Sequence, residues 1–400
     1  AIMDRVPKHI AKRQLEKLNS IHTIFNDASK MTFLSEYLNW KYNNVLSINN
    51  QKFPLVVFPA KENQWTSLET VLSKSLNTTH KQKKDFLFYD SRHKDVLSKA
   101  DMLDPSINKS GYVMSKIQTE PMIRLECEVG TYLDSISTSE CLKYEILLAL
   151  DGISNIEGNE KNFKSFDNKL KLRSHLHKTI TNPLIDGGGR SSAIGVSTLI
   201  AYKENGFYNF LIGRRSQKGV TVYPRMQHVV PSSMFQSIVG DLENEYSITH
   251  NIFREYLEEI FNIKEEPRAM HFKYFYKDPN LEYLRNLLNE KVAKLYFTGI
   301  AIDLLNLRPE ICTLLVIDTP DWYSVHSSGA EHIAFGTLKP ITFCDEFEKA
   351  GECSDKKLLR KMQYIEKNSV DNYPISPLNT TPSGNAAFWL GLEVFKKVVK

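Results

Sequence analysis

Short apolar runs and turn residues alternate in a regular order over the second half of the chain. Runs that read as strands, because they are short, apolar and rich in β-branched and aromatic residues, lie at residues 193–202, 208–214, 228–230, 294–302 and 310–317. The dipeptide Asn205-Gly206 separates the first two runs and predicts a hairpin turn. A helical pattern that includes residues 254–259 lies between the third and the fourth run. This order predicts a small mixed sheet flanked by helices.

The first half of the chain carries patterns of both kinds. Apolar spacing predicts helices at residues 4–48 and 140–150 and strands at residues 53–58 and 122–132. We recognise no catalytic motif in this half. It is expected to be an α+β region.

Two domains are expected, because 400 residues exceed what one hydrophobic core serves well. Residues 151–186 are polar and rich in Asn, Lys and Gly, which predicts a boundary. We therefore expect a separate α+β domain at residues 1–180 and a second domain at residues 185–400. The second domain is expected to end in a helix at residues 386–399.

Composition narrows the class of protein. Apolar residues make up 42% and charged residues 24%, a normal globular balance, and a net charge of +4 does not by itself indicate a nucleic-acid or membrane partner. No apolar run approaches the length that spans a bilayer. Lysine-rich segments at residues 81–84 and 355–361 are expected to be solvated. The lack of a bilayer-length apolar run predicts a soluble protein, and five cysteines without paired spacing predict a reducing, cytoplasmic compartment.

Residues 254–259, Arg-Glu-Tyr-Leu-Glu-Glu, bring acidic side chains to one side of the predicted helix. At about 100° per residue, Glu255, Glu258 and Glu259 share one arc, and apolar residues fill the opposite arc. Carboxylates at these spacings repel by roughly 0.2–0.5 kcal/mol per pair, a penalty that an oxygen-seeking Mg²⁺ or Mn²⁺ reverses. The pattern predicts either a metal site or an exposed acidic face with Arg254 as a partial counter-charge.

The sequence around this helix resembles the Nudix hydrolase signature. That signature runs Gly, five residues, Glu, seven residues, Arg-Glu, an apolar residue, any residue, Glu-Glu, any residue and Gly. Aligned on Arg254, the first glycine is Gly240 and the apolar position is Tyr256. The order of strands, loop and helix is also that of a Nudix domain.

Several positions depart from the signature. Tyr246 stands at the early glutamate, with Glu243 and Glu245 nearby, and Phe261 stands at the closing glycine. Ser232-Ser233 replaces the two glycines of the Pro-Gly-Gly that usually precedes the motif. The resemblance therefore supports the superfamily more strongly than it supports activity.

The resemblance implies a Nudix-like α/β/α sandwich in the C-terminal half, covering about residues 190–338. It implies an enzyme that uses Mg²⁺ or Mn²⁺ to cleave a nucleoside diphosphate linked to another group. Glu255, Glu258 and Glu259 would bind the metal, and Arg254 would orient a carboxylate through its fork of donors. Glu245, or Glu243 in its place, would supply a further carboxylate ligand.

Other parts of the site are implied by the same resemblance. An acid or base from a later loop would be Glu331, with Glu310, Asp318 and Asp321 as alternatives. Phosphate contacts would come from Arg214, Arg215 and Arg225. The departures leave a second function open, in which a Nudix-like domain has lost hydrolysis and binds a nucleotide-like ligand as a sensor or regulator.

Overall fold

The computed structural model of the chain describes most of its residues. They are residues 13, 16–17, 20–74, 76, 82–99, 109–216, 223, 225–264, 271–327, 331–332, 334–348, 373 and 375–399. The chain divides into two compact units. Unit 1 comprises Ala1–Val57, Leu72–Ile194 and Ile302–Pro309, and unit 2 comprises Phe58–Val71, Gly195–Ala301 and Glu310–Lys400. Each unit therefore includes a segment from the opposite half of the chain.

Unit 1 combines helices with antiparallel strand pairs. Its helices are α2 (Ala28–Tyr42), α3 (Arg92–Lys99), α4 (Tyr132–Ser135), α5 (Cys141–Asp151), α6 (Glu160–Asp167) and α7 (Lys171–Thr179), with shorter turns at His22–Asn26 and Ile136–Glu140. Its strands are β1 (Ser47–Ile48), β2 (Gln51–Lys52), β4 (Ser110–Gln118) and β5 (Arg124–Thr131), which pair as β1–β2 and β4–β5. Phe33 and Tyr37 of α2 pack against Phe163 and Phe166 of α6. This unit is α+β, as its sequence predicts.

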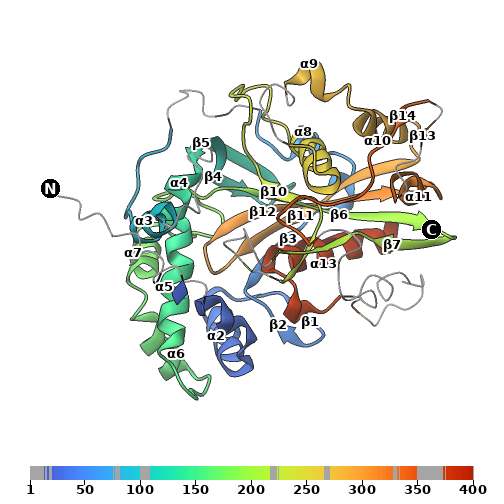
Figure 1. Cartoon of the computed structure of the whole chain (residues 1–400). Helices are drawn as coiled ribbons and strands as arrows, with labels where there is room; N and C mark the ends of the chain where they lie inside the picture. Colours follow the sequence, from blue (N-terminus) through green and yellow to red (C-terminus); the bar gives the residue numbers. More distant parts are fainter. Residues whose placement is uncertain are drawn as a thin grey trace. The chain divides into compact units, whose positions relative to one another are not determined.

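The largest sheet is mixed and lies mainly in unit 2 (Figure 1). Its strands lie in the order β10 (Ser232–Met234), β6 (Gly195–Glu204), β12 (Arg308–Ile317), β11 (Ala293–Asp303) and β3 (Leu55–Pro59), and β7 (Phe207–Phe210) also pairs with β6. Strand β6 runs parallel to β12 and antiparallel to β10 and β7. Two further antiparallel pairs join β8 (Ile212–Arg214) to β9 (Gln227–Val229) and β13 (Glu331–His332) to β14 (Gly336–Thr337).

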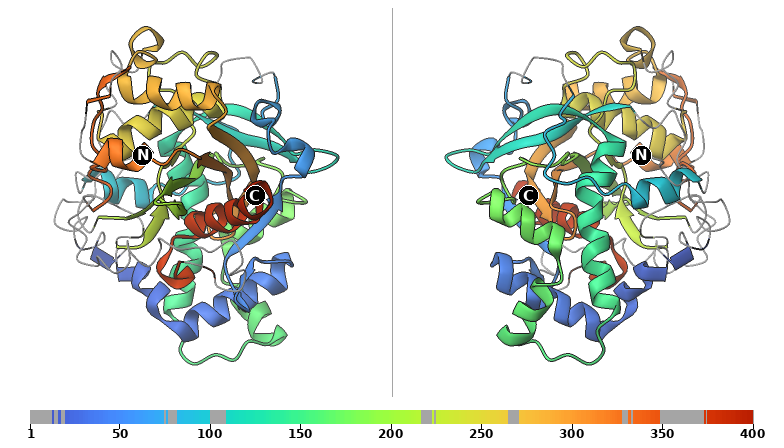
Figure 2. Two further views of the ribbon diagram at one scale, coloured as in Figure 1. Left: turned by 90° about the vertical axis from the view of Figure 1, so that its right-hand side faces the viewer. Right: turned by 90° about the vertical axis from the view of Figure 1, so that its left-hand side faces the viewer.

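Helices cover both faces of this sheet. Helix α8 (Ile248–Glu255) lies on one face and α13 (Pro382–Val398) on the other (Figures 1 and 2). Successive strand residues point to opposite faces, so neighbours on β6 meet different helices. Ile200 belongs to a buried cluster with Phe253 and Tyr256. Leu199 packs against α13, where a Cβ added to Gly391 would lie 2.7 Å from a Leu199 carbon. The helix with the acidic residues therefore packs on the face of the sheet to which Ile200 points, and α13 packs on the face to which Leu199 points.

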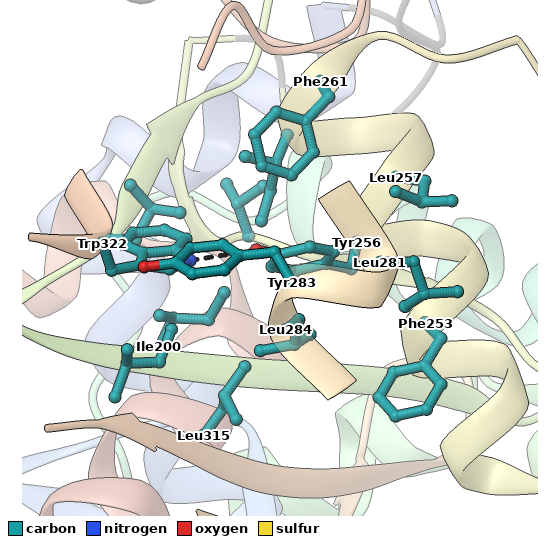
Figure 3. Close-up of a cluster of buried hydrophobic side chains, with 14 of the residues drawn as sticks. Ile200, Phe253, Tyr256, Leu257, Phe261, Leu281, Tyr283, Leu284, Leu315 and Trp322 are labelled. Atoms are coloured by element: carbon teal, nitrogen blue, oxygen red, sulfur yellow. Dashed lines mark hydrogen bonds between the residues drawn. The ribbon is translucent and has the colours of Figure 1, made fainter. Parts of the chain in front are cut away.

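An apolar cluster fastens that helix to the sheet (Figure 3). The described part of unit 2 also contains α9 (Phe272–Phe275), α10 (Pro279–Asn289) and α11 (Trp322–Ser327), with short turns at Glu62–Gln64, Leu68–Thr70 and Pro377–Asn379. Trp322 of α11 donates its indole N–H to the Tyr256 hydroxyl at 3.0 Å. Leu281 and Leu284 of α10 are fully buried in the same cluster. Tertiary packing thus fixes the rotation of the helix.

The predicted hairpin is present, with positive φ at Asn205 (51°) and Gly206 (81°), as a two-residue turn of this type requires. The predicted strand 208–214 is divided: β7 pairs with β6, whereas β8 pairs with β9. The segment after residue 230, expected to be a loop, contains β10, which pairs with β6. The closing helix begins at Pro382, earlier than expected.

The two compact units divide at residues 194 and 195, whereas the sequence predicts a boundary between residues 180 and 185. The polar stretch 151–186 contains α6 and α7. Lys83 is buried and donates to Glu128 at 2.9 Å, so this part of the lysine-rich segment 81–84 is not solvated. Residues 355–361 lie outside the described residues. Over the described part of the chain, no helix is both long and apolar enough to cross a bilayer.

Candidate metal centre

The helix that carries the predicted ligands begins at Ser247, whose hydroxyl accepts the N–H of His250 as an N-cap. Beyond Glu255 it continues as a π-helical turn over Tyr256–Ile260. Two of the three predicted ligands lie in this turn. Single π-helical turns are rare and are frequently found at functional sites.

Glu255, Glu258 and Glu259 converge. One ligand oxygen from each lies within 4.8 Å of those from the other two. Glu255 is only 5% exposed and Glu259 only 2% exposed, while Glu258 is half-buried. Burial of two of the three carboxylates rules out an ordinary solvated acidic face, because a charge leaves water only at a large cost unless a partner compensates it.

The surroundings of Glu259 disfavour its charge. One oxygen of its carboxylate accepts the backbone N–H of Ser232 at 2.6 Å. Burial raises the pKa of Glu259 well above its usual value, and the charges of Glu255, Glu346 and Glu258 raise it further, whereas the Ser232 N–H lowers it. Ionised Glu259 therefore favours a bound cation.

Arg254 holds Glu255 in place. Its side chain is 1% exposed, and its guanidinium donates to the Gln236 carbonyl at 3.0 Å, the Asn251 amide oxygen at 2.9 Å and the Glu255 carboxylate at 3.0 Å. A planar fork with three fixed acceptors has little freedom to rotate. Arg254 is thus bonded to a carboxylate of the group, while its role in orienting a metal ligand and in catalysis stays a prediction.

Glu245, predicted as a further metal ligand, serves a different structure. Its buried carboxylate accepts the hydroxyl of Ser237 and the backbone N–H groups of Ile238, Val239 and Asp241. These bonds close the loop before α8, in which Gly240 adopts a φ of 84° that favours glycine. Glu245 is not part of the three-carboxylate group. Its oxygens are engaged in shaping the loop.

Glu346 is a neighbour of the cluster that the sequence motif does not reveal. The backbone N–H of Cys344 donates to the Glu259 carbonyl at 2.9 Å, and the Glu346 carbonyl accepts the N–H of Ser216 at 2.9 Å. Residues 344–348 are thereby held beside the helix. Glu346 is exposed, and its charge contributes to the raised pKa of Glu259. In the sequence, the one indication of Glu346 is that it follows the predicted strands.

The predicted phosphate-binding arginines lie along the same segment. The Arg214 carbonyl accepts the N–H of Glu348 at 2.8 Å, and the Arg215 guanidinium lies 6.0 Å from the centre of the Phe347 ring. Arg225 is exposed, has a φ of 63° and donates its backbone N–H to the Arg215 carbonyl at 3.0 Å. The three arginines are therefore connected to the segment that carries Glu346, and phosphate binding by them stays a prediction.

The backbone of Glu331 lies in β13 opposite Thr337. The neighbouring His332 packs its ring 5.0 Å from that of Tyr283. The side chain of Glu331 lies outside the described residues, so its predicted role stays a prediction.

The alternatives to Glu331 have other partners. Glu310 pairs with Gly195 in the sheet, on the α13 face, and accepts the hydroxyl of Ser197. Asp318 forms an ion pair with Lys203 at 3.1 Å. None of the three alternatives joins the carboxylate group on the described part of the chain.

Aromatic packing fills two positions where the chain departs from the Nudix signature. Tyr246, at the early glutamate, stacks on Phe235 with ring centres 6.0 Å apart. Phe261, at the closing glycine, packs against Tyr256 at 5.2 Å and His326 at 4.6 Å. The fold therefore accommodates both departures through aromatic packing.

The donor set fits a hard divalent cation. All three candidate ligands are carboxylates, which Mg²⁺ and Mn²⁺ prefer. The thiol of nearby Cys344 stays protonated, because burial, followed by the charge of Glu259, raises its pKa. The chain matches no protein-family profile and no curated protein, so its function has to be inferred from this geometry.

Proposed function

We propose that the chain is a divalent-metal-dependent, Nudix-type hydrolase of a nucleoside diphosphate linked to another group. The observation that carries the proposal is the group of Glu255, Glu258 and Glu259, three converging carboxylates on one helix, two of them buried. The mixed sheet between α8 and α13 supports a Nudix-like α/β/α sandwich. A diphosphate needs its charge neutralised before it can be cleaved, and a carboxylate-bound Mg²⁺ or Mn²⁺ meets that need.

Each residue has a part in this proposal. Glu255, Glu258 and Glu259 would hold the ion, and Arg254 keeps Glu255 oriented. When bound, the ion would neutralise the diphosphate and polarise the bond to be cleaved. Glu346, exposed beside the cluster, is our candidate to accept the proton of the attacking water at its carboxylate.

The test is hydrolysis of a panel of nucleoside diphosphate derivatives with Mg²⁺ or Mn²⁺. Glu258→Gln and Glu259→Gln should each lower the rate by more than the roughly 10- to 100-fold typical of losing an outer-shell partner of a metal ligand. Glu282→Gln changes an exposed acid of α10 outside the carboxylate group and is the matched control. No turnover by the wild-type chain above that of the two site variants would sink the proposal.

A second function has one observation in its favour. Tyr246 stands where the signature has a glutamate, and Glu245 is committed to the loop, so the cluster has fewer carboxylates than the full signature implies. A sensor or regulator needs to bind a nucleotide-like ligand without cleaving it. Calorimetry distinguishes the two functions: ligand binding without metal dependence and without product indicates the sensor.

A further inference from the structure

Asn251 lies one helical turn before Arg254 and is 1% exposed. Its amide oxygen accepts the Arg254 guanidinium at 2.9 Å, and its amide nitrogen donates to the Ser233 hydroxyl at 3.2 Å. A guanidinium can only donate, so the oxygen of the amide has to face Arg254. This requirement leaves the nitrogen facing Ser233.

These contacts form a continuous chain from the edge of the sheet to a carboxylate of the site. It runs from Ser233 through Asn251 and Arg254 to Glu255, with the last bond at 3.0 Å. Ser233 stands where Nudix sequences usually have a glycine, and a glycine has no hydroxyl for Asn251 to reach. The departure from the signature thus supplies the first member of the chain.

The same edge strand also holds the other buried carboxylate. The backbone N–H of Ser232 donates to Glu259 at 2.6 Å. Strand β10 is therefore connected to Glu259 directly and to Glu255 through Asn251 and Arg254. The relative placement of the two buried carboxylates depends on this strand.

We propose that Ser233 and Asn251 are positioning residues that fix the orientation of Glu255 and thereby set the affinity of the site for a divalent cation. This inference rests on the proposed function. The physical reason is general: groups that orient a metal ligand determine how much of its binding energy is realised, and losing one typically costs about 10- to 100-fold in affinity.

The test measures Mn²⁺ affinity of the full chain by electron paramagnetic resonance and by calorimetry. We expect Ser233→Ala and Asn251→Ala to weaken Mn²⁺ binding by about 10- to 100-fold. Ser233→Thr keeps the hydroxyl and should bind like the wild type. Ser247→Ala removes the N-cap of the same helix and controls for general loss of stability, because the Ser247 hydroxyl caps His250, while Asn251 bonds to the Ser247 backbone carbonyl, which alanine keeps.

The Mn²⁺ affinities of the wild type and the variants distinguish failure of the inference from failure of the proposed function. If the wild type binds Mn²⁺ and Ser233→Ala and Asn251→Ala bind it equally well, the inference is wrong and the proposed function stands. An equal loss in Ser247→Ala also overturns the inference, since the effect would then be one of helix stability. If the wild type binds no Mn²⁺, the proposed function fails as well. Should Asn251→Ala not fold, Ser233→Ala decides alone.

Discussion

Three buried glutamates of unit 2 are compensated in different ways. Glu245 accepts a hydroxyl and several backbone N–H groups, and Glu255 accepts the Arg254 guanidinium. Glu259 has the Ser232 N–H and is surrounded by carboxylates of like charge. A divalent cation would therefore stabilise its ionised form.

Replacing Glu259 with glutamine should stabilise the metal-free protein. The glutamine oxygen can still accept the Ser232 N–H at the same place, while the repulsion from Glu255 and Glu258 disappears. We expect a higher Tm in chelator, by about 1 °C for each kcal/mol of relieved repulsion in a chain of 400 residues. Mn²⁺ should raise the Tm of the wild type and leave that of the variant nearly unchanged.

The stabilisation of the metal-free protein by Glu259→Gln should depend on pH. A raised pKa means that folded Glu259 binds a proton more tightly than the unfolded chain does. This contribution to stability is present below the unfolded pKa and is lost as pH rises through the folded pKa. The advantage of Glu259→Gln in chelator should therefore grow as the pH rises above the usual pKa of a glutamate. A constant or shrinking advantage would show that the repulsion is absent.

Removing the Arg254 side chain should destabilise the protein strongly. Arg254→Ala removes a cation that pairs with the buried Glu255 carboxylate, and breaking a buried pair in this way costs about 3–5 kcal/mol. Urea unfolding measures the loss. The double variant with Glu255→Gln should recover part of it, because the uncompensated charge is gone. Full additivity of the two changes would contradict the proposed pairing.

At the scale of elements, the helix could be predicted from sequence and its π-helical turn could not. The apolar spacing of Phe253, Tyr256 and Leu257 indicates a helix that packs on a core, and they pack on one. The turn at Tyr256–Ile260 depends on tertiary contacts such as the Trp322 bond to Tyr256. Local pattern carries no information about such distant partners.

The candidate site also depends partly on contacts with distant residues, which local sequence pattern does not report. The convergence of the three carboxylates followed from their spacing on one helix, which is local information. Glu346 reaches the site because Cys344 bonds to the Glu259 backbone, a long-range contact. Glu245 looked like a ligand because it is acidic and near the motif, but the loop at Gly240 takes up its oxygens. An acidic residue next to a turn can serve either purpose.

The variant Glu245→Gln distinguishes a role of Glu245 in holding the loop from a role in binding metal. An amide has one oxygen in place of two, so some of the loop N–H groups lose their acceptor, at a cost of about 1–3 kcal/mol for a buried group left unsatisfied. We expect a lower urea midpoint. Mn²⁺ affinity should fall less than in Glu258→Gln. A loss of Mn²⁺ affinity larger than that of Glu258→Gln would indicate that Glu245 is a metal ligand.

At the scale of the whole molecule, the division into units follows contacts that sequence composition does not report. The polar stretch 151–186 looks like a linker, yet it forms α6 and α7, which bury Phe163, Phe166 and Leu176. The segment Phe58–Val71 belongs to unit 2 although it lies far from the rest of that unit in the chain. A linear boundary at residues 180–185 therefore cannot separate the two units.

Because unit 2 includes Phe58–Val71, we expect that a fragment of residues 185–400 will not form the native structure of unit 2. It lacks Phe58–Val71, in which the Trp65 carbonyl accepts the N–H of Phe297 at 2.8 Å and the Ala60 N–H donates to the Thr298 carbonyl at 2.9 Å. Strand β11 would then present unpaired backbone groups, which favour aggregation. We expect the fragment to lose the cooperative urea transition of the full chain, and linking residues 50–71 to its N-terminus to restore part of it. If the fragment alone unfolds cooperatively at the same urea midpoint and binds Mn²⁺ equally well, Phe58–Val71 is dispensable and unit 2 folds from the C-terminal half alone.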